Sequence, residues 1–238
     1  MDRLTIQALQ EMKRQGRKIA GVVAWDAPMA EIAERAGADL VSVGDSVGVN
    51  LWGRSEEAAV SLEEMLIVCK AVRHGVKRAL LSCDVPSGSL DDARRLMTEG
   101  GADMVKVFAA AERVRAISRN GIPVFAEFHG GRATSELVAD AKALEEAGAV
   151  LLDFRHSGEE AGAAVAKAVS IPVLGGLGGG PWLDGRMRMA HAAIGYAASW
   201  IDSHAETYAN VARISLDALS AYIRDVKEER QLKGQRRG

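Results

Sequence analysis

Short apolar runs alternate with amphipathic segments along most of the chain. The apolar runs begin near residues 19, 40, 79, 103, 123, 150, 172 and 194. In the segments between them apolar residues recur every three or four positions, which is typical of helices that bury one face. Strands alternating with helices predict a parallel sheet. About eight strands in a chain near the ~250 residues typical of such folds predict a (β/α)8 TIM barrel, with a doubly wound open sheet as the alternative.

A recurring joint between helix and strand supports this alternation. Residues Arg35–Val43, Glu99–Val107 and Glu146–Phe154 each contain a helix end, a glycine and then an apolar run. Glycine is the common residue just after a helix end because it adopts left-handed backbone angles without strain. Ser61 followed by Glu64 is the pattern of a capping box at a helix start. We therefore expect these segments to form successive βα units.

The two ends of the chain depart from the alternating pattern. Residues Leu4–Gln15 predict a short N-terminal helix that ends at Gly16 and covers the bottom of the barrel. From Ala192 to Glu229 the chain is predicted to be mostly helical, which gives extra C-terminal helices. Residues 228–238 are too polar to pack and are expected to form a frayed tail. We interpret residues 1–238 as one barrel domain.

Composition narrows the classes of partner. The 238 residues are 48% hydrophobic and 26% charged, with a net charge of -2, so no basic field suggests nucleic acid or an acidic membrane. No apolar window approaches the length of a membrane span. The two cysteines, Cys69 and Cys83, lack metal-type spacing and fit reduced thiols in the cytoplasm. A small molecule is the expected partner.

Candidate chemistry lies where the predicted strands end, because barrel enzymes place functional residues at the carboxyl ends of their strands. In the stretch Val41–Gly53 a carboxylate and a hydroxyl, Asp45 and Ser46, follow the strand between two glycines. The other strand-end candidates are Trp25, Asp26, Asp84, Lys106, Phe108, Glu127, His129, Asp153, Arg155, His156 and the glycine run 175–180.

Two of these carboxylates predict a metal site. Asp45 and Asp84 follow neighbouring strands and can share one Mg²⁺, which usually keeps several waters and uses one or two protein carboxylates. The structural alternative is that Asp84 caps the loop before Pro86. Lys106 lies in an apolar strand and needs an anionic partner or substrate, because an unpaired buried ammonium is costly. A Lys106–Asp153 pair across the barrel is the structural explanation.

Several short sequence segments together resemble the conserved segments of one enzyme family. They cover most of the chain: Ala24–Asp26, Val43–Gly48, Val60–Met65, Lys70–Gly75, Asp84–Pro86, Ala102–Lys106, Ile171–Gly175 and Tyr208–Val211. In number and order these phrases resemble those of ketopantoate hydroxymethyltransferase, of the phosphoenolpyruvate mutase and isocitrate lyase superfamily. The resemblance implies an enzyme that enolises an α-keto acid and adds a one-carbon unit from methylenetetrahydrofolate.

The resemblance also implies roles for residues. Asp45 and Asp84 would hold Mg²⁺, which would chelate the α-keto acid, while Ser46 and Lys106 would bind the substrate carboxylate and its surroundings. Trp25 stands in the turn where the family has a tyrosine, and would be close to the substrate. A Lewis acid on the keto oxygen stabilises the enolate formed when a base removes the C3 proton.

Three positions depart from the family pattern. Phe108 and Arg155 stand where the family has glutamates, and Glu127 replaces a histidine. Arginine cannot act as a base because it is effectively always protonated. If the enzyme enolises its substrate, the base is expected to be Glu127, Asp153 or His156, in that order, although Glu127 could instead be a third carboxylate near the ion.

The resulting hypothesis is a Mg²⁺-dependent, hydroxymethyltransferase-like enzyme that forms a carbon–carbon bond beside an α-keto acid, such as 3-methyl-2-oxobutanoate. Arg155 favours a substrate with a second anionic group, because guanidinium binds carboxylate or phosphate in a bidentate manner. A lyase or aldolase acting on an oxo-diacid is therefore one alternative, and a non-catalytic keto-acid-binding paralogue is another. The superfamily resemblance favours a homo-oligomer.

Overall fold

The computed structural model describes residues 3–55, 60–108 and 110–234. By its internal contacts the chain divides into two compact units, Met1–Arg188 and Met189–Gly238, and each is described by itself. The interpretation of residues 1–238 as one domain stays a prediction.

The first unit is built on a closed barrel of parallel strands, paired in sequence order from β1 to β8. The strands are β1 (Ile19–Val23), β2 (Leu40–Val43), β3 (Leu80–Asp84), β4 (Met104–Phe108), β5 (Val124–His129), β6 (Ala149–Arg155), β7 (Val173–Gly175) and β8 (Gly185–Met189). This confirms the predicted (β/α)8 barrel and excludes the doubly wound alternative.

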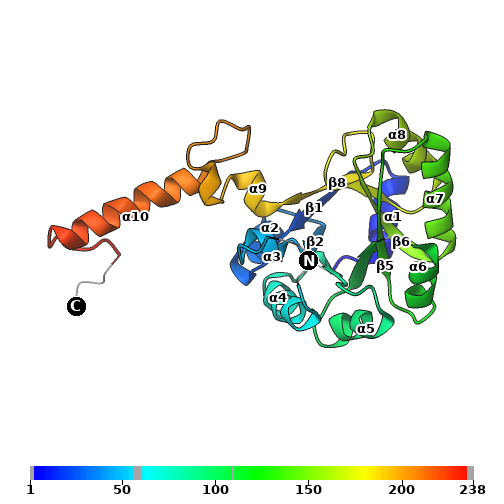
Figure 1. The fold of residues 1–238 in the computed structure, drawn as a ribbon, viewed down its shortest axis with the longest axis horizontal. Coiled ribbons are helices and arrows are strands. Elements are labelled where there is room, and N and C mark those ends of the chain that lie inside the picture. Colours follow the sequence, from blue (N-terminus) through cyan, green and yellow to red (C-terminus); the bar gives the residue numbers. More distant parts are fainter. Residues whose placement is uncertain (1–2, 56–59, 109, 235–238) are drawn as a thin grey trace. The chain divides into compact units, whose positions relative to one another are not determined.

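Helices of the first unit surround the strands (Figure 1). They are α1 (Ile6–Arg14), α2 (Ala27–Arg35), α3 (Val47–Asn50), α4 (Leu62–Gly75), α5 (Leu90–Thr98), α6 (Ala111–Ser118), α7 (Thr134–Glu146) and α8 (Glu159–Ala168). The predicted capping box is present at α4, where Ser61 accepts from the backbone of Glu64 and the Glu64 side chain accepts from the backbone of Ser61. Glycines 37, 101 and 148 adopt positive φ at the predicted helix-to-strand joints.

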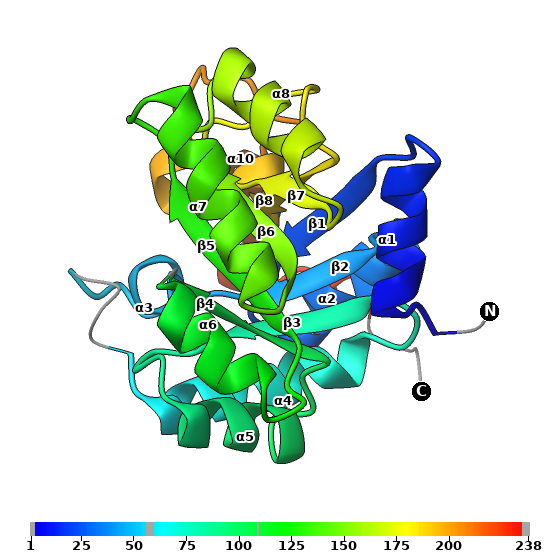
Figure 2. The same ribbon diagram turned by 90° about the vertical axis from the view of Figure 1, so that its right-hand side faces the viewer.

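The core lies inside the barrel and is closed at the bottom by α1. Leu9 and Met12 of this helix pack with inward side chains of the strands, among them Leu40, Met104 and Phe125. Figure 2 shows α1 at the end of the barrel where the strands begin and α3 at the end where they finish. The bottom is therefore filled with apolar side chains, and the end near α3 is free to carry polar ones.

The eighth strand is not where the apolar pattern placed it. A strand was expected near residue 194, but residues Ala190–Ile194 form helix α9 and the strand is Gly185–Met189. In this strand Arg186 and Arg188 are exposed and alternate with buried positions, so no continuous apolar run marks it. Alternation with one solvated face is a strand pattern too, but arginine at two of five positions conceals it.

The second unit consists of helices joined by irregular segments. It contains α9, the short 3₁₀-helix η2 (Ala198–Trp200) and α10 (Val211–Lys227). The expectation of a mostly helical stretch from Ala192 to Glu229 is confirmed, with an irregular interruption at residues 201–210. Residues 228–234 form neither helix nor strand, and the last four residues of the predicted frayed tail lie outside the described residues. Among the described helices, none combines the length and the apolarity needed to cross a membrane.

Candidate active site

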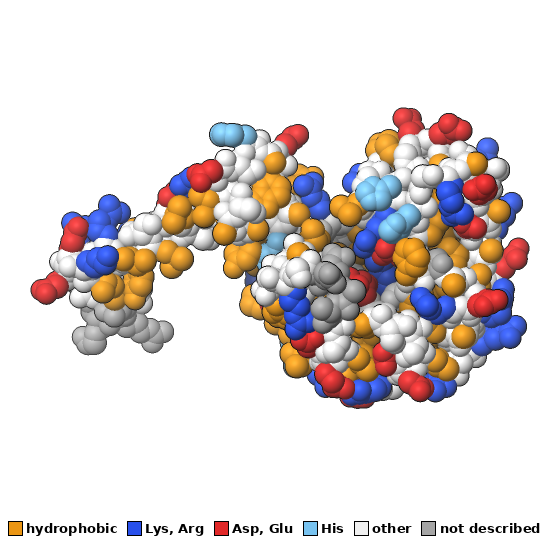
Figure 3. Space-filling view, viewed as in Figure 1, with side chains coloured by type: hydrophobic (Ala, Val, Ile, Leu, Met, Phe, Trp, Pro, Cys, Tyr) orange, Lys and Arg blue, Asp and Glu red, His pale blue; other side chains and the backbone are white. Residues whose placement is uncertain are grey.

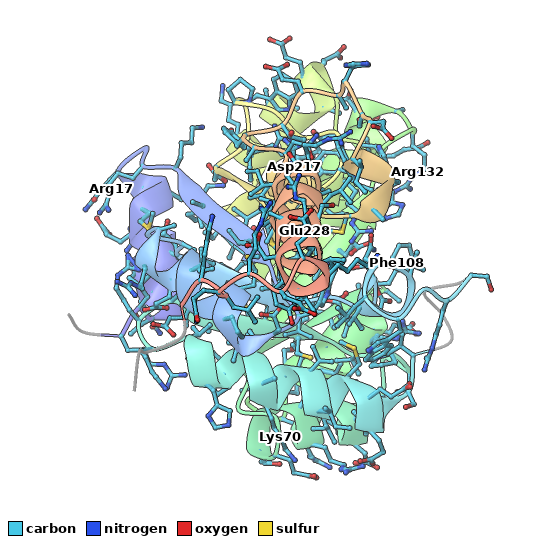
Figure 4. The ribbon with its side chains drawn as sticks, turned by 90° about the vertical axis from the view of Figure 1, so that its left-hand side faces the viewer. Arg17, Lys70, Phe108, Arg132, Asp217 and Glu228 are labelled. Atoms are coloured by element: carbon cyan, nitrogen blue, oxygen red, sulfur yellow. The ribbon has the colours of Figure 1, made fainter. Side chains whose placement is uncertain are left out.

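Charged side chains gather at the carboxyl ends of neighbouring strands. They are, in chain order, Asp45, Asp84, Lys106, Glu127 and Arg155. Parallel pairing sets Asp84 beside Lys106 and Glu127 beside Asp153. In Figure 3, acidic, basic and histidine side chains surround a hollow in the first unit. Figure 4 shows Phe108 and Arg132 at this end of the barrel and Arg17 at the other.

These side chains line one small pocket of about 190 Å³. All five of the charged residues just named border it, together with Arg113 and the residues around Pro86. We call it the catalytic pocket. Its position agrees with the expectation that strand ends meet at the top of the barrel.

Lys106 is the buried cation of the cluster, with only 5% of its side chain exposed. Its ammonium is hydrogen-bonded to Glu127 Oε2, lies 3.3 Å from Asp153 Oδ2 and lies 3.8 Å from Asp84 Oδ1. Burial acts to lower the pKa of Lys106, but the charges of Asp84, Asp153 and Glu127 outweigh it and raise the pKa. Lys106 is therefore a permanent positive charge, and the expected Lys106–Asp153 contact is confirmed.

Glu127 is held by two cations at one carboxylate oxygen and by a histidine at the other. Arg155 Nη2 lies 3.1 Å from the same Oε2 that bonds Lys106, while His129 Nε2 lies 3.0 Å from Oε1. Burial acts to raise the pKa of Glu127, but Lys106 and Arg155 together lower it below its ordinary value. Glu127 is therefore ionised, and its neighbour His129, with 45% of its side chain exposed, connects it to solvent.

Asp45 and Asp84 form the anionic side of the pocket. The backbone N–H of Asp45 lies 3.4 Å from Asp84 Oδ2. Burial raises the pKa of Asp45, and it raises the pKa of Asp84 to about 7 against the opposing charge of Lys106. Within the described chain Asp84 Oδ1 is buried and accepts no hydrogen bond. The alternative that Asp84 only caps the following loop does not explain this unbonded oxygen.

Asp153 lies behind the pocket and is only 2% exposed. Its Oδ1 accepts from the backbone N–H of Gly176 at 2.9 Å, and Arg155 Nε lies 3.5 Å from Oδ2. A Cβ on Gly175 would lie 2.8 Å from the Cα of Gly179, so the glycine run after β7 forms a tightly packed turn. This turn orients Asp153, and Asp153 in turn stabilises Lys106.

Three other predicted residues lie near the catalytic pocket without bordering it. Ser46 is the N-cap residue just before α3, and its Oγ would be 3.0 Å from a Cβ added to Gly44. Trp25 is buried, and its indole N–H donates to the carbonyl of Gly44 at 3.2 Å. His156 has a φ of 52°, and its ring stands 6.2 Å from that of His129. Trp25 therefore supports the loop that carries Asp45.

Arg113 is a pocket residue that the sequence reasoning missed. It stands in the first turn of α6, its side chain packs over Gly88, and it donates to the carbonyl of Phe108 at 3.4 Å. The only available signal was its place one turn into the helix that follows β4. His129 was noted only as a strand-end residue, and its contact with Glu127 follows from their spacing of two along β5.

A metal ion would have few protein ligands in this site. Among the described residues, no group of three or more histidine, cysteine or acidic side chains is arranged to hold an ion. Asp45 and Asp84 are two carboxylates at one pocket wall. Two carboxylates are sufficient for Mg²⁺, which usually retains several waters.

Comparison with known proteins places this chain in a family. A profile of ketopantoate hydroxymethyltransferase matches residues 3–131 and 129–231. A 3-methyl-2-oxobutanoate hydroxymethyltransferase of Shouchella clausii is 33% identical over 94% of this chain and 90% of its own length. The protein of the same name from Geobacillus kaustophilus is 34% identical over 91% of this chain and 87% of its own.

Solved structures support the fold alone. A phosphonopyruvate hydrolase complex with oxalate and Mg²⁺ has a TM-score of 0.64 at 15% identity, covering 94% of this chain and 87% of its own. A 2,3-dimethylmalate lyase, described as a PEP mutase/isocitrate lyase superfamily member, has a TM-score of 0.62 at 15% identity, covering 98% and 88%. The profile and the sequence relatives show that the chain belongs to the ketopantoate hydroxymethyltransferase family, whose named members are transferases.

Proposed function

We propose that this chain is a Mg²⁺-dependent transferase that enolises an α-keto acid, 3-methyl-2-oxobutanoate or a related compound, and adds a hydroxymethyl group to the enolate carbon. The observation that supports this most is that Asp45 and Asp84 line one pocket together with the buried Lys106, whose ammonium lies 3.8 Å from Asp84 Oδ1. Anionic and cationic groups therefore border the same space of about 190 Å³. A compound with a keto oxygen beside a carboxylate matches both.

The two aspartates fit a divalent cation. Asp84 Oδ1 is buried without a hydrogen bond in the described chain, and burial raises the pKa of both carboxyl groups. Desolvated carboxylates gain most from a cation that replaces the lost water. Asp45 and Asp84 would therefore hold Mg²⁺, with water and substrate completing its coordination. When bound, the ion polarises the keto oxygen and stabilises the negative charge of the enolate.

Lys106 is proposed to bind the substrate carboxylate, assisted by the backbone and hydroxyl of Ser46. Its ammonium is shared among three carboxylates, so an incoming anion competes for it directly. When Lys106 turns to the substrate, Glu127 loses one of the two cations that lower its pKa. Substrate binding is thus expected to raise the proton affinity of Glu127.

Glu127 is the proposed base. Of the three candidate bases in the described chain, Glu127 alone lines the catalytic pocket. Asp153 lies behind the pocket and accepts from the backbone of Gly176, and His156 lies outside the pocket. A general base is most effective when its pKa lies near the operating pH, so the expected rise in the proton affinity of Glu127 favours this role. The contact of Oε1 with His129 gives the accepted proton a route to solvent. Arg155, charged at all ordinary pH values, orients Glu127 and takes no proton.

Proton exchange tests this function without requiring the one-carbon donor. The protein is incubated with Mg²⁺ and 3-methyl-2-oxobutanoate in D₂O, and the C3 proton signal is followed by NMR. We expect its loss to require the metal and to stop with EDTA. Asp84→Ala is expected to abolish Mg²⁺-dependent keto-acid binding, while Glu127→Gln keeps binding and slows exchange. Asp91→Ala, which removes an exposed carboxylate on α5, is the matched control.

Failure of exchange has a specific meaning. If neither 3-methyl-2-oxobutanoate nor oxaloacetate exchanges or shifts the melting temperature, both enzyme hypotheses are wrong. Binding with a thermal shift but no exchange would identify a non-catalytic keto-acid-binding paralogue. Methylenetetrahydrofolate is the proposed one-carbon donor, and hydroxymethylated product that forms only in its presence would support that assignment.

A lyase that cleaves an oxo-diacid is the second candidate function. Arg113 favours it, because this guanidinium borders the pocket and its hydrogen bond is to the carbonyl of Phe108. With Arg155 it provides a second cationic wall suited to another carboxylate. Preferential Mg²⁺-dependent cleavage of a diacid, lost in Arg113→Gln, would favour this function over hydroxymethyl transfer.

We also propose that the protein is a homo-oligomer that works in the cytoplasm. Helix α10 exposes much of its apolar surface: Ile214, Leu219, Tyr222, Ile223 and Val226 are each at least 48% exposed. A helix with such a stripe usually packs on another element, and a second copy is a suitable partner. Both cysteines are free thiols, which fits a reducing compartment.

A further inference from the structure

A second and larger cavity lies beside the catalytic pocket. It has a volume of about 550 Å³ and lies between α6 and α7, next to the ends of β4 and β5. We call it the side pocket. Phe108 borders both cavities, and His129 of the side pocket is 3.0 Å from Glu127 of the catalytic pocket. A molecule in the side pocket is therefore a neighbour of whatever occupies the catalytic pocket.

The catalytic pocket is too small for a second organic molecule beside the keto acid. In the proposed function its space of about 190 Å³ takes the keto acid and the metal ion. Pockets that bind organic ligands usually have volumes of roughly 300–1,000 Å³, and the side pocket lies in that range. Ala111 on α6 and Ala143 on α7 border it with methyl groups only, which keeps the space between the helices open. A molecule that carries a one-carbon unit can therefore bind next to the keto acid.

Aromatic rings form part of the wall of the side pocket. The ring of Phe108 is 58% exposed and meets the ring of His129 edge-on, with centroids 5.3 Å apart. Phe128 is buried in the wall and stacks on Phe154 with ring centroids 4.4 Å apart. Such a wall favours a flat ring as ligand, because aromatic rings attract one another in stacked and edge-on arrangements in addition to burying apolar area.

A charged pair provides hydrogen-bond acceptors and donors at the edge of the side pocket. Arg132 and Asp140 both border it and are bonded to each other, with 48% and 44% of their side chains exposed. A carboxylate accepts two neighbouring N–H groups, and a guanidinium donates to a carbonyl oxygen. The aminopyrimidinone edge of a pterin presents two N–H donors beside a carbonyl and matches this pair. An exposed ion pair contributes little to stability, so a ligand can replace its bond at small cost.

We infer that the side pocket binds the ring system of the one-carbon carrier, a reduced pterin such as that of tetrahydrofolate. Phe108 is the aromatic surface against the ring, and the pair of Arg132 and Asp140 binds its polar edge. This inference rests on the proposed function, which names such a donor without placing it. In the described chain neither Asp45 nor Asp84 borders the side pocket, so the carrier is expected to bind without the metal ion.

Calorimetric binding of tetrahydrofolate to the full chain, in EDTA and without keto acid, tests the inference. Ala143→Trp fills the side pocket from α7 and Ala111→Trp fills it from α6, and each is expected to weaken binding about tenfold or more. Ala116→Trp, at an exposed position of α6, is the matched control and keeps the wild-type affinity. None of the three changes is expected to alter the Mg²⁺-dependent binding of 3-methyl-2-oxobutanoate.

The polar edge is tested separately, which keeps the inference testable if both tryptophan variants fold poorly. The wild type is expected to prefer tetrahydrofolate over p-aminobenzoylglutamate, which lacks the pterin, by about tenfold or more. Asp140→Asn should reduce this ratio, because an amide cannot accept both N–H groups. An unchanged ratio would show that Asp140 does not bind the pterin edge and would overturn that assignment.

The outcomes separate this inference from the proposed function. If the keto acid exchanges its C3 proton with Mg²⁺ but tetrahydrofolate does not bind, the side-pocket assignment is wrong and enolisation stands. The assignment is also wrong if folded tryptophan variants bind tetrahydrofolate as the wild type does, or if its binding requires Mg²⁺. If tetrahydrofolate binds as expected but no keto acid binds or exchanges, the site assignment holds and the proposed function is wrong.

Discussion

Replacing Lys106 by methionine is expected to destabilise the protein in a pH-dependent manner. Methionine has a similar length and no charge, so the change removes the ammonium and leaves most of the volume. Lys106 is 5% exposed and contacts carboxylates of three residues, Asp84, Glu127 and Asp153. Removing one partner of a buried ion pair typically costs about 3–5 kcal/mol. Because Arg155 still contacts two of these carboxylates, we expect about 3 kcal/mol at pH 8.

The sign of the pH dependence follows from the carboxyl groups that remain. Lys106 lowers the pKa of Asp84 and of Glu127, so its loss raises both in the folded state. A carboxyl whose folded pKa lies above its unfolded value binds more protons when folded, and stability then falls as pH rises through that interval. The destabilisation is therefore full at pH 8 and decreases as pH falls toward about 4, near the unfolded pKa values.

Urea unfolding at pH 8 and pH 5, in EDTA, measures this effect as the difference in unfolding free energy between variant and wild type. Lys70→Met is the control, since Lys70 lies exposed on α4 (Figure 4), and surface changes are usually within about 0.5 kcal/mol. An equal loss at both pH values would indicate lost packing rather than lost charge, and it would refute the electrostatic account of the cluster.

Three further changes have defined outcomes. Asp84→Asn is expected to stabilise the metal-free protein at pH 8 by up to about 4 kcal/mol, because a folded-state pKa of about 7 means that ionised Asp84 destabilises the fold. This gain in stability should vanish near pH 4, where Asp84 is protonated in the folded wild type, and thermal unfolding in EDTA at both pH values measures it. His129→Gln should keep keto-acid affinity but slow C3 proton exchange, and an unchanged exchange rate would remove the proposed proton route. Leu219→Asp with Ile223→Asp should lower the mass seen by sedimentation, whereas Asp217→Ala, an exposed change on the same helix, should not.

Much of the barrel could be predicted because its local patterns agree with its overall fold. Seven strands follow apolar runs, and the glycines at positions 37, 101 and 148 mark helix ends by their positive φ. Parallel strands in a closed barrel all end on the same face, so residues at the strand ends were expected to meet there. The five residues that do line one pocket are Asp45, Asp84, Lys106, Glu127 and Arg155. A fold can be predicted from such a sequence because its local preferences agree with its overall structure.

The remainder depends on contacts between distant residues, which spacing does not encode. The indole of Trp25 bonds to the carbonyl of Gly44, 19 positions away, and no local pattern indicates this contact. Arg113 reaches the pocket because its side chain passes over Gly88, which no local pattern indicates. The prediction missed strand β8 for a local reason, because two exposed arginines conceal the alternation of its buried and exposed positions.

The charges of the site predict that metal and substrate bind cooperatively. In the described chain, four carboxylates border the catalytic pocket or bond to its lysine, against the three cations Lys106, Arg113 and Arg155. When all are ionised the site is negative and repels a keto acid, which is itself an anion. A divalent cation reverses that sign and makes the same site attractive.

By linkage, the two effects must be equal: the factor by which Mg²⁺ increases the affinity of the protein for the keto acid is also the factor by which the keto acid increases its affinity for Mg²⁺. Calorimetric titration in both orders measures the two factors, and we expect each to be about tenfold or more, corresponding to about 1.4 kcal/mol. Asp84→Asn removes one negative charge and a metal ligand, so the keto acid should bind it with little dependence on Mg²⁺. Independent binding of the two ligands to the wild type would show that Asp45 and Asp84 do not place the ion beside the substrate.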